Sequence, residues 1–194
     1  MTEYRPTPLF GGAITTSLPS TFADVSEIRQ VPDNQEVYLD PHGTTSILFD
    51  ILERVEKPDV EALHFHLEDI VDDDARVKVW GSGTVHLAKI PRDVQAYALL
   101  ATSPTAGNSS SSNAAQRSEA DFVGILLTMV RLEEQKTDLL IVINVPHLEA
   151  DGYKPSDVDL ERGRYGPLLE RAMEFRAKIW ETLDVKDWGL FGEG

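Results

Sequence analysis

The sequence contains no cysteine, which excludes a disulfide framework, a thiolate metal site and a cysteine nucleophile. It also has no run of apolar residues near the ~20 that a membrane-spanning helix needs. The N-terminus, MTEYRPTPLFGGAITT, lacks the basic start and the apolar core of a secretory signal. We therefore expect a protein of the nucleus, and also of the cytoplasm, that does not enter a membrane.

Positive charge is scarce, because 18 Lys and Arg residues stand against 33 Asp and Glu residues, a formal net charge of -15. This balance repels nucleic-acid phosphates and anionic lipid headgroups, so neither is expected as a partner. It suits a basic protein partner, because complementary fields speed encounter. The same acidity would also arise if it served only to keep the protein soluble.

Motifs for metal, nucleotide or covalent chemistry are missing as well. His64 and His66 stand two apart in a predicted helix and point about 200° apart, so they do not share an ion easily. Residues 72–74 lack the glycine and the spaced Glu of a calcium loop, and Gly11-Gly12 lacks the Lys of a phosphate loop. Gly81-Ser82-Gly83 is typical of a hairpin turn. We predict no metal, no cofactor and no catalytic residue.

The 194 residues, 41% of them hydrophobic, are enough for one domain spanning residues 1–194. Many short apolar segments predict strands, and the gaps between the later ones are too short for crossover helices, so the sheet should be largely antiparallel. The Ser-rich residues 103–118 predict a flexible hairpin loop. The predicted strands cover residues 9–18, 35–39, 76–80, 84–87, 94–102, 122–132 and 139–145.

Helical periodicity marks three further segments. Apolar residues at helical spacing predict a helix over residues 46–55 and a second one over 59–71. Gly166-Pro167 opens a third helix, because Pro suits a first-turn position, and Asp24 is a plausible cap for a single helical turn over 24–29. The resulting expectation is an α+β domain, with a twisted antiparallel sheet flanked by helices.

Two acids in the first predicted helix form a candidate site. Asp50 and Glu53 stand three residues apart, which on a helix places them side by side on the face opposite the apolar stripe. They are then positioned to contact a partner. An amphipathic helix always has a polar face, however, so the pattern alone also fits a plain solvated surface.

Several sequence blocks resemble the Ran guanine nucleotide release factors, small eukaryotic proteins of nuclear transport. The blocks keep their order along nearly the whole chain, and PDNQEVY at 32–38 is far more specific than a lone glycine motif. They cover residues 9–15, 24–29, 31–38, 47–53, 65–69, 137–146 and 190–192.

The resemblance implies a protein that binds Ran and promotes release of GTP by binding, without enzymatic activity. It also implies the fold of an extrinsic photosystem II protein, with a six-stranded antiparallel sheet between helices. The carboxylates that it implies for Ran binding match Asp50, Glu53, Asp24 and Glu36, with Glu27 and Asp33 as further candidates in the same blocks. We expect a monomer, and the sequence leaves open whether a second Ran-binding protein joins the complex.

Two other functions fit the same residues. An enzyme using paired carboxylates on a small molecule would place them face to face across a pocket, one with a raised pKa. A passive scaffold would use the acids only for solubility. Residues 103–118 and 149–164 depart from the family pattern, and we assign no function to them.

Overall fold

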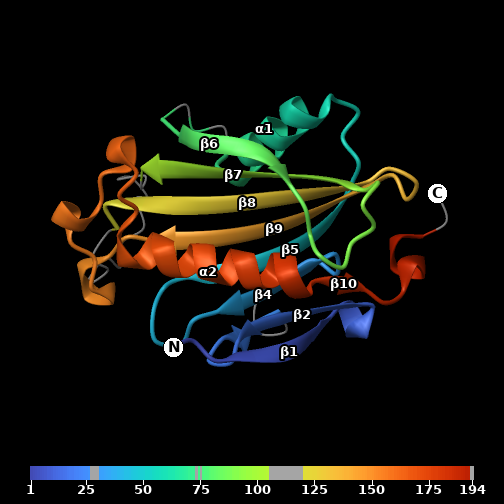
Figure 1. The fold of residues 1–194 in the computed structure, drawn as a ribbon, viewed down its shortest axis with the longest axis horizontal. Coiled ribbons are helices and arrows are strands. Elements are labelled where there is room, and N and C mark those ends of the chain that lie inside the picture. Colours follow the sequence, from blue (N-terminus) through green and yellow to red (C-terminus); the bar gives the residue numbers. More distant parts are fainter. Residues whose placement is uncertain (27–30, 73, 75, 105–119, 193–194) are drawn as a thin grey trace.

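The computed structural model describes residues 1–26, 31–72, 74, 76–104 and 120–192. The expected α+β class is confirmed, with an antiparallel main sheet of order β3-β4-β5-β9-β8-β7-β6 in this part of the chain (Figure 1). Six longer strands form it, and the two-residue β3 extends one edge. The strands are β3 (Ala23–Asp24), β4 (Gln35–Leu39), β5 (Ser46–Glu53), β6 (Lys78–Val85), β7 (Gln95–Pro104), β8 (Phe122–Leu132) and β9 (Thr137–Pro146).

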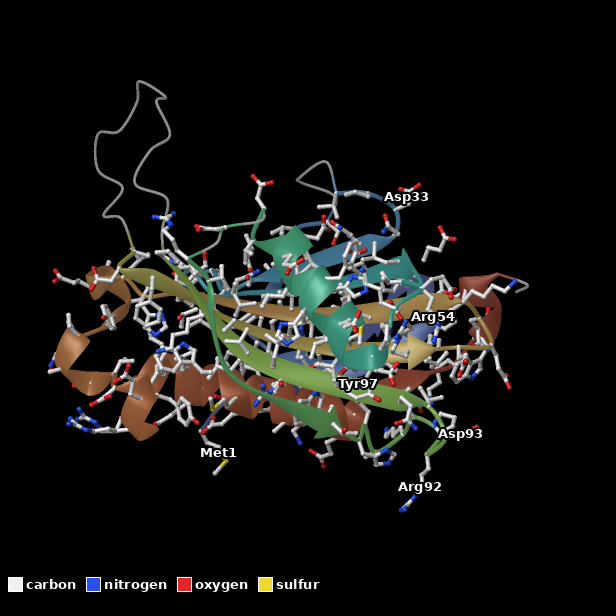
Figure 2. The ribbon with its side chains drawn as sticks, turned by 90° about the horizontal axis from the view of Figure 1, so that it is seen from above. Met1, Asp33, Arg54, Arg92, Asp93 and Tyr97 are labelled. Atoms are coloured by element: carbon white, nitrogen blue, oxygen red, sulfur yellow. The ribbon has the colours of Figure 1, made fainter. Side chains whose placement is uncertain are left out.

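The central strands are apolar on both faces because a helix covers each face. Helix α2 (Gly166–Thr182) lies across one face and α1 (Asp59–Ile70) lies against the other, as Figures 1 and 2 show together. In β8 all residues from Gly124 to Leu132 are buried. On the α2 side the core includes Leu126, Ile141, Leu169, Phe175 and Ile179, and on the α1 side it includes Leu63, Leu67, Leu99, Leu127 and Val142.

A second, smaller sheet joins the two ends of the chain. β1 (Tyr4–Leu9) pairs with β2 (Ile14–Pro19), and β2 pairs in turn with β10 (Asp184–Val185). The hydroxyls of Thr16 and Thr182 lie 3.1 Å apart and fix α2 to β2. β2 confirms the later part of the strand expected over residues 9–18, whereas Phe10–Gly12 form a 3₁₀ turn. β1 contains two prolines and was not predicted, since proline lowers the propensity for a strand.

The prediction of a helix over residues 46–55 was wrong, because Ser46–Glu53 form strand β5. All eight residues pair with β9, from Ser46 opposite Asn144 to Glu53 opposite Thr137. Ile47 and Phe49 enter the core on the α2 side, and Leu48 packs on the α1 side. A strand buried on both faces has a continuous apolar run that contains helical spacings by chance.

Two other local predictions also differ from the structure. Gly81-Ser82-Gly83 lies inside β6 and is not a hairpin turn, so the two strands expected over 76–87 are one. Asp24 lies in β3 and does not open a helical turn. Residues 27–30 and most of the loop expected over 103–118 lie outside the described residues.

The remaining elements are short, and they join the strands and helices just described. Five 3₁₀ turns lie within the described part of the chain, at Phe10–Gly12, Glu149–Asp151, Pro155–Asp157, Leu160–Arg162 and Trp188–Phe191. Three of them follow β9 and lead into α2. Among the described helices, none is both long and apolar enough to cross a membrane.

Candidate functional site

The carboxylate of Asp50 is buried and held by two side-chain amides. Asn34 Nδ2 donates to Asp50 Oδ1 at 2.8 Å, and Gln35 Nε2 donates to Oδ2 at 2.8 Å. Asn34 also donates to the carbonyl of Ile51 at 3.0 Å. The middle of the PDNQEVY block therefore forms a clamp on Asp50, which is only 7% exposed.

Burial determines the protonation behaviour of Asp50. It raises the pKa of this carboxyl above its usual value, and the hydrogen bond from Gln35 and the nearby imidazole of His66 offset the increase only in part. Asp69 on α1 raises the pKa further. Asp50 therefore does not lie on the outer face of a helix, as expected from the sequence, but faces α1 from the sheet.

Glu53 lies elsewhere than the sequence analysis placed it. Because side chains alternate along a strand, residues 50 and 53 point to opposite faces of the sheet and do not form one patch on one face. Glu53 is exposed at the end of β5. Its carboxylate is therefore available to a partner, whereas that of Asp50 is engaged inside the protein.

Glu36 also holds part of the fold. Its Oε1 accepts the backbone N–H of Phe10 at 2.6 Å, and its Oε2 accepts the Tyr38 hydroxyl at 3.2 Å. Phe10 has a φ of 49°, a conformation that non-glycine residues seldom adopt, and the Glu36 bond stabilises that turn. Burial is the main cause that raises the pKa of Glu36.

The other three expected carboxylates fall into two groups. Asp24 and Asp33 are exposed, and Asp24 accepts the backbone N–H of Ser26 at 2.9 Å. Glu27 lies outside the described residues. Figure 2 shows Asp33 and Arg54 toward the same end of the molecule, where β5 ends. The structure therefore leaves Glu53, Asp33 and Asp24 exposed at the β3–β5 side of the sheet.

A buried ionic network holds the segment that follows Glu53. Arg131, 3% exposed, donates to Asp138 Oδ1 at 3.1 Å and to Asp59 Oδ1 at 2.8 Å. It also donates to the carbonyls of Val55 at 2.6 Å and Lys57 at 2.9 Å. One guanidinium thus fixes the whole connection between β5 and α1.

Asp138 is the second centre of this network and is fully buried. Its Oδ2 lies 2.8 Å from His66 Nε2 and accepts the N–H of Val55 at 3.1 Å. Burial raises the pKa of Asp138, but the bonds from His66 and Val55 and the charge of Arg131 outweigh it and hold the pKa below its usual range. The ionised form is therefore the stable one.

A groove of about 670 Å³ opens at the same end of the sheet. Arg54 is one of the lining residues. Its guanidinium makes two long ion pairs, 3.7 Å to Glu56 and 4.0 Å to Glu133, and its Nε is buried without a partner among the described residues. None of the five described carboxylates expected for binding lines this groove. Its other charged lining residues are Asp59, Asp93, Arg131, Glu133 and Glu134.

Sequence reasoning missed the clamp and the network, and a signal was present for only one of them. Arg131 and Asp138 are directly paired across the β8–β9 hairpin, so opposite charges flanking the predicted turn indicate their contact. The clamp depends on Gln35 pairing with Asp50, a register that a helix over 46–55 conceals.

Comparison with known proteins gives a consistent result. Over residues 7–146 the chain matches the family described as Ran-interacting Mog1 protein. It is 32% identical over 152 residues to the Ran guanine nucleotide release factor of Homo sapiens, covering 75% of this chain and 78% of that relative. It is 28% identical over 189 residues to the nuclear import protein mog1 of Schizosaccharomyces pombe, covering 94% and 98% respectively.

Solved structures agree with the fold. The crystal structure of the Saccharomyces cerevisiae Ran-binding protein Mog1p matches with a TM-score of 0.72 and 26% identity, over 99% of this chain and 100% of that one. The solution structure of a PsbP protein from Synechocystis matches with a TM-score of 0.55 and 9% identity, over 95% and 94%, which confirms the expected likeness in fold alone. With a family match over most of its length, the chain belongs to the Ran-interacting Mog1 family.

Proposed function

We propose that this chain binds the GTPase Ran and promotes release of its guanine nucleotide, and that it acts in nuclear transport from the nucleus and the cytoplasm. The names of the human and fission yeast relatives support this function. Residues 1–194 act as a single Ran-binding domain, by binding and not as an enzyme.

The observation that carries the proposal is the amide clamp on Asp50. The clamp joins the PDNQEVY block to β5 at the point where exposed carboxylates lie on either side, Asp33 before the clamp and Glu53 after it. Asp50 and Glu36 are positioning residues in this reading, because their oxygens are engaged inside the protein. Glu53, Asp33 and Asp24 are the groups that contact the partner.

The mechanism requires no bond to form or break. GTPases of this class hold their nucleotide through a phosphate loop, its lysine and Mg²⁺, all of which favour negative charge. Carboxylates placed at that rim compete for the basic groups and stabilise the nucleotide-free state. Because linkage is reciprocal, a factor that weakens nucleotide affinity is itself bound more weakly when nucleotide is present.

The test is release of a fluorescent GTP analogue from preloaded Ran. Glu53→Ala should slow release at least tenfold, and Glu53→Lys should slow it more, because a lost interfacial charge contact costs about 2 kcal/mol or more and repulsion adds to it. Asp72→Lys is the matched control, an exposed acid beyond the end of α1. Equal release by Glu53→Lys and the wild type, or equal loss in the control, would contradict the assignment.

Asp50 needs a different substitution from Glu53. Removing its carboxylate with Ala leaves the amides of Asn34 and Gln35 without their acceptor, so a loss of binding would be mixed with a loss of fold. Asp50→Asn keeps the shape, but besides removing the charge it replaces one acceptor oxygen with an NH₂ donor that faces the amide of Asn34 or Gln35. One of the two clamp bonds is therefore lost, and we expect a lower melting temperature than that of the wild type but a smaller decrease than in Asp50→Ala.

A further inference from the structure

Strand β6 leaves one edge of the main sheet open. It is the last strand in the order, and within the described residues its backbone pairs only with β7. Residues 81–84 are exposed, and the strand contains no proline and only one charged residue, Lys78. Natural edges are usually blunted by charge, proline or a covering element. Within the described residues of β6, the edge has two such devices, a bulge between Val79 and Gly81 and the charge of Lys78 at the start of the strand, and neither lies within residues 81–84 that are exposed.

The two glycines of β6 create a hollow beside this edge. Gly81 and Gly83 alternate with Ser82 and stand on the same side as Val85, which packs in the α2-side core. A Cβ built on either glycine meets nothing within 4 Å. The result is a groove of about 270 Å³ between β6 and α2, whose walls include Trp80, Leu160, Tyr165, Met173, Arg176 and Trp180.

Arg176 gives the groove its chemistry. Its guanidinium stacks on the Trp180 ring at 4.7 Å, and it makes no hydrogen bond or ion pair with any described residue. No Asp or Glu lines the groove, although the chain has 33 acids against 18 bases. A half-buried guanidinium with free donors is complementary to a carboxylate, which it binds through two parallel hydrogen bonds.

We propose that β6 and this groove bind an extended peptide segment that adds a strand to the sheet and places an acidic side chain against Arg176. Main-chain pairing along β6 supplies part of the affinity, as in other cases of strand addition. Glycine inside a strand marks a place where another chain approaches closely. Because side chains alternate, the residues two positions from the acid lie over the same groove and contact the Trp180 and Tyr165 rings.

This surface is separate from the one proposed for Ran. β6 lies at the opposite edge of the main sheet from β3 and β4. The exposed carboxylates near β5 suit a basic partner, whereas the groove presents a cation to an acidic one. Both surfaces can be occupied together, so failure of one assignment leaves the other intact.

The experiment uses the full chain and a positional-scanning library of N-acetylated, C-amidated octapeptides. The wild type should select Asp or Glu at one position, with an apolar residue two positions away. Arg176→Gln should lose the acidic preference while keeping the apolar one. Selection without an acid, or no selection at all, would overturn the proposal.

A labelled peptide from that selection then tests the groove by fluorescence polarisation. Gly83→Val fills the hollow with a side chain that fits the strand, and should weaken binding at least tenfold. Ser82→Val is the matched control, since it places the same side chain on the opposite face, and should stay within about twofold of wild type. Equal binding by Gly83→Val and wild type would refute the groove assignment.

Two further readouts separate a binding defect from a folding defect. Circular dichroism melting should give Gly83→Val a stability no lower than that of wild type, and nucleotide release from Ran should be unchanged. Hydrogen exchange of the amides in residues 79–84 should slow when the peptide binds, because an added strand protects them. Unchanged exchange in these residues would overturn strand addition.

Discussion

Arg131→Met tests whether the buried network holds the β5–α1 connection. Met keeps the apolar length of the side chain but removes every donor. Asp138, fully buried, then keeps only its contacts with His66 and Val55 N–H. The carbonyl of Lys57 loses its side-chain donor, and that of Val55 keeps only the N–H of Lys57. Removing one partner of a buried ion pair costs about 3–5 kcal/mol.

For a domain of this size, each kcal/mol corresponds to about 2–4 °C in melting temperature, so we expect a decrease of roughly 6–20 °C. Nucleotide release from Ran should also slow, because the segment after Glu53 loses its anchors. The assay is thermal unfolding at pH 7 and at pH 5. The deficit should shrink as the pH falls, because loss of the Arg131 charge raises the folded pKa of Asp138 from its depressed wild-type value and the variant then takes up that proton before the wild type does.

Arg54→Met is the matched control for this variant. Arg54 is 20% exposed and makes only the 3.7 and 4.0 Å contacts, which in solvent contribute about 0–1 kcal/mol. Its buried Nε has no partner, so its removal leaves nothing unsatisfied. The double variant Arg131→Met with Asp138→Asn should recover part of the loss. If Arg131→Met melts within about 2 °C of wild type, the network does not have the role assigned to it.

Three further predictions follow from other parts of the molecule. Gly124→Ala should cost about 1–3 kcal/mol, because its Cβ would lie 2.6 Å from Leu169 Cδ2 in a filled core, whereas Gly83→Ala in open space is the control. Burial lowers the pKa of His147 below its usual value, so the unfolded chain binds this proton at a higher pH than the folded chain does. The free energy of unfolding should therefore decrease as the pH drops below about 6.5. Urea unfolding at several pH values should show that this part of the decrease is missing in His147→Gln. Association with Ran should slow with rising salt, measured by stopped flow, since the screening length falls from about 10 Å at 0.1 M to about 3 Å at 1 M; a salt-independent rate would contradict an electrostatic interface.

Secondary structure could be predicted where the apolar residues of a segment followed one dominant pattern. Both long helices, α1 and α2, bury an apolar stripe at helical spacing, and strands β7 to β9 are long β-branched or Leu-rich runs between turns. The helix prediction for residues 46–53 was wrong because both faces of β5 are covered, which removes the alternation of apolar and polar residues that distinguishes a strand. The turn prediction for residues 81–83 was wrong because glycine is typical of turns, whereas in β6 the two glycines leave open space on one face of the strand.

The candidate site was predictable as a set of sequence blocks but not as a geometry. The PDNQEVY block and the residues around Asp50 were predicted to belong to one binding surface, and the structure brings them into contact through the clamp. The roles of the individual carboxylates depended on strand pairing, which sets which oxygens are engaged. That pairing joins residues far apart in sequence, and local patterns carry no information about it.

The smaller sheet has a consequence for synthesis in the cell. Its middle strand, β2, pairs with β10, so Ile14 cannot form this pair until Val185 has been synthesised. At translation rates of about 5–20 residues per second, that wait is roughly ten to thirty seconds. During this time β1 and β2 can form only a hairpin, which is at best marginally stable by itself. The nascent chain is therefore exposed to chaperones and to mispairing through its N-terminal strands, and variants that loosen the β2–β10 pairing should lower yield in cells more than they lower the melting temperature of the purified protein.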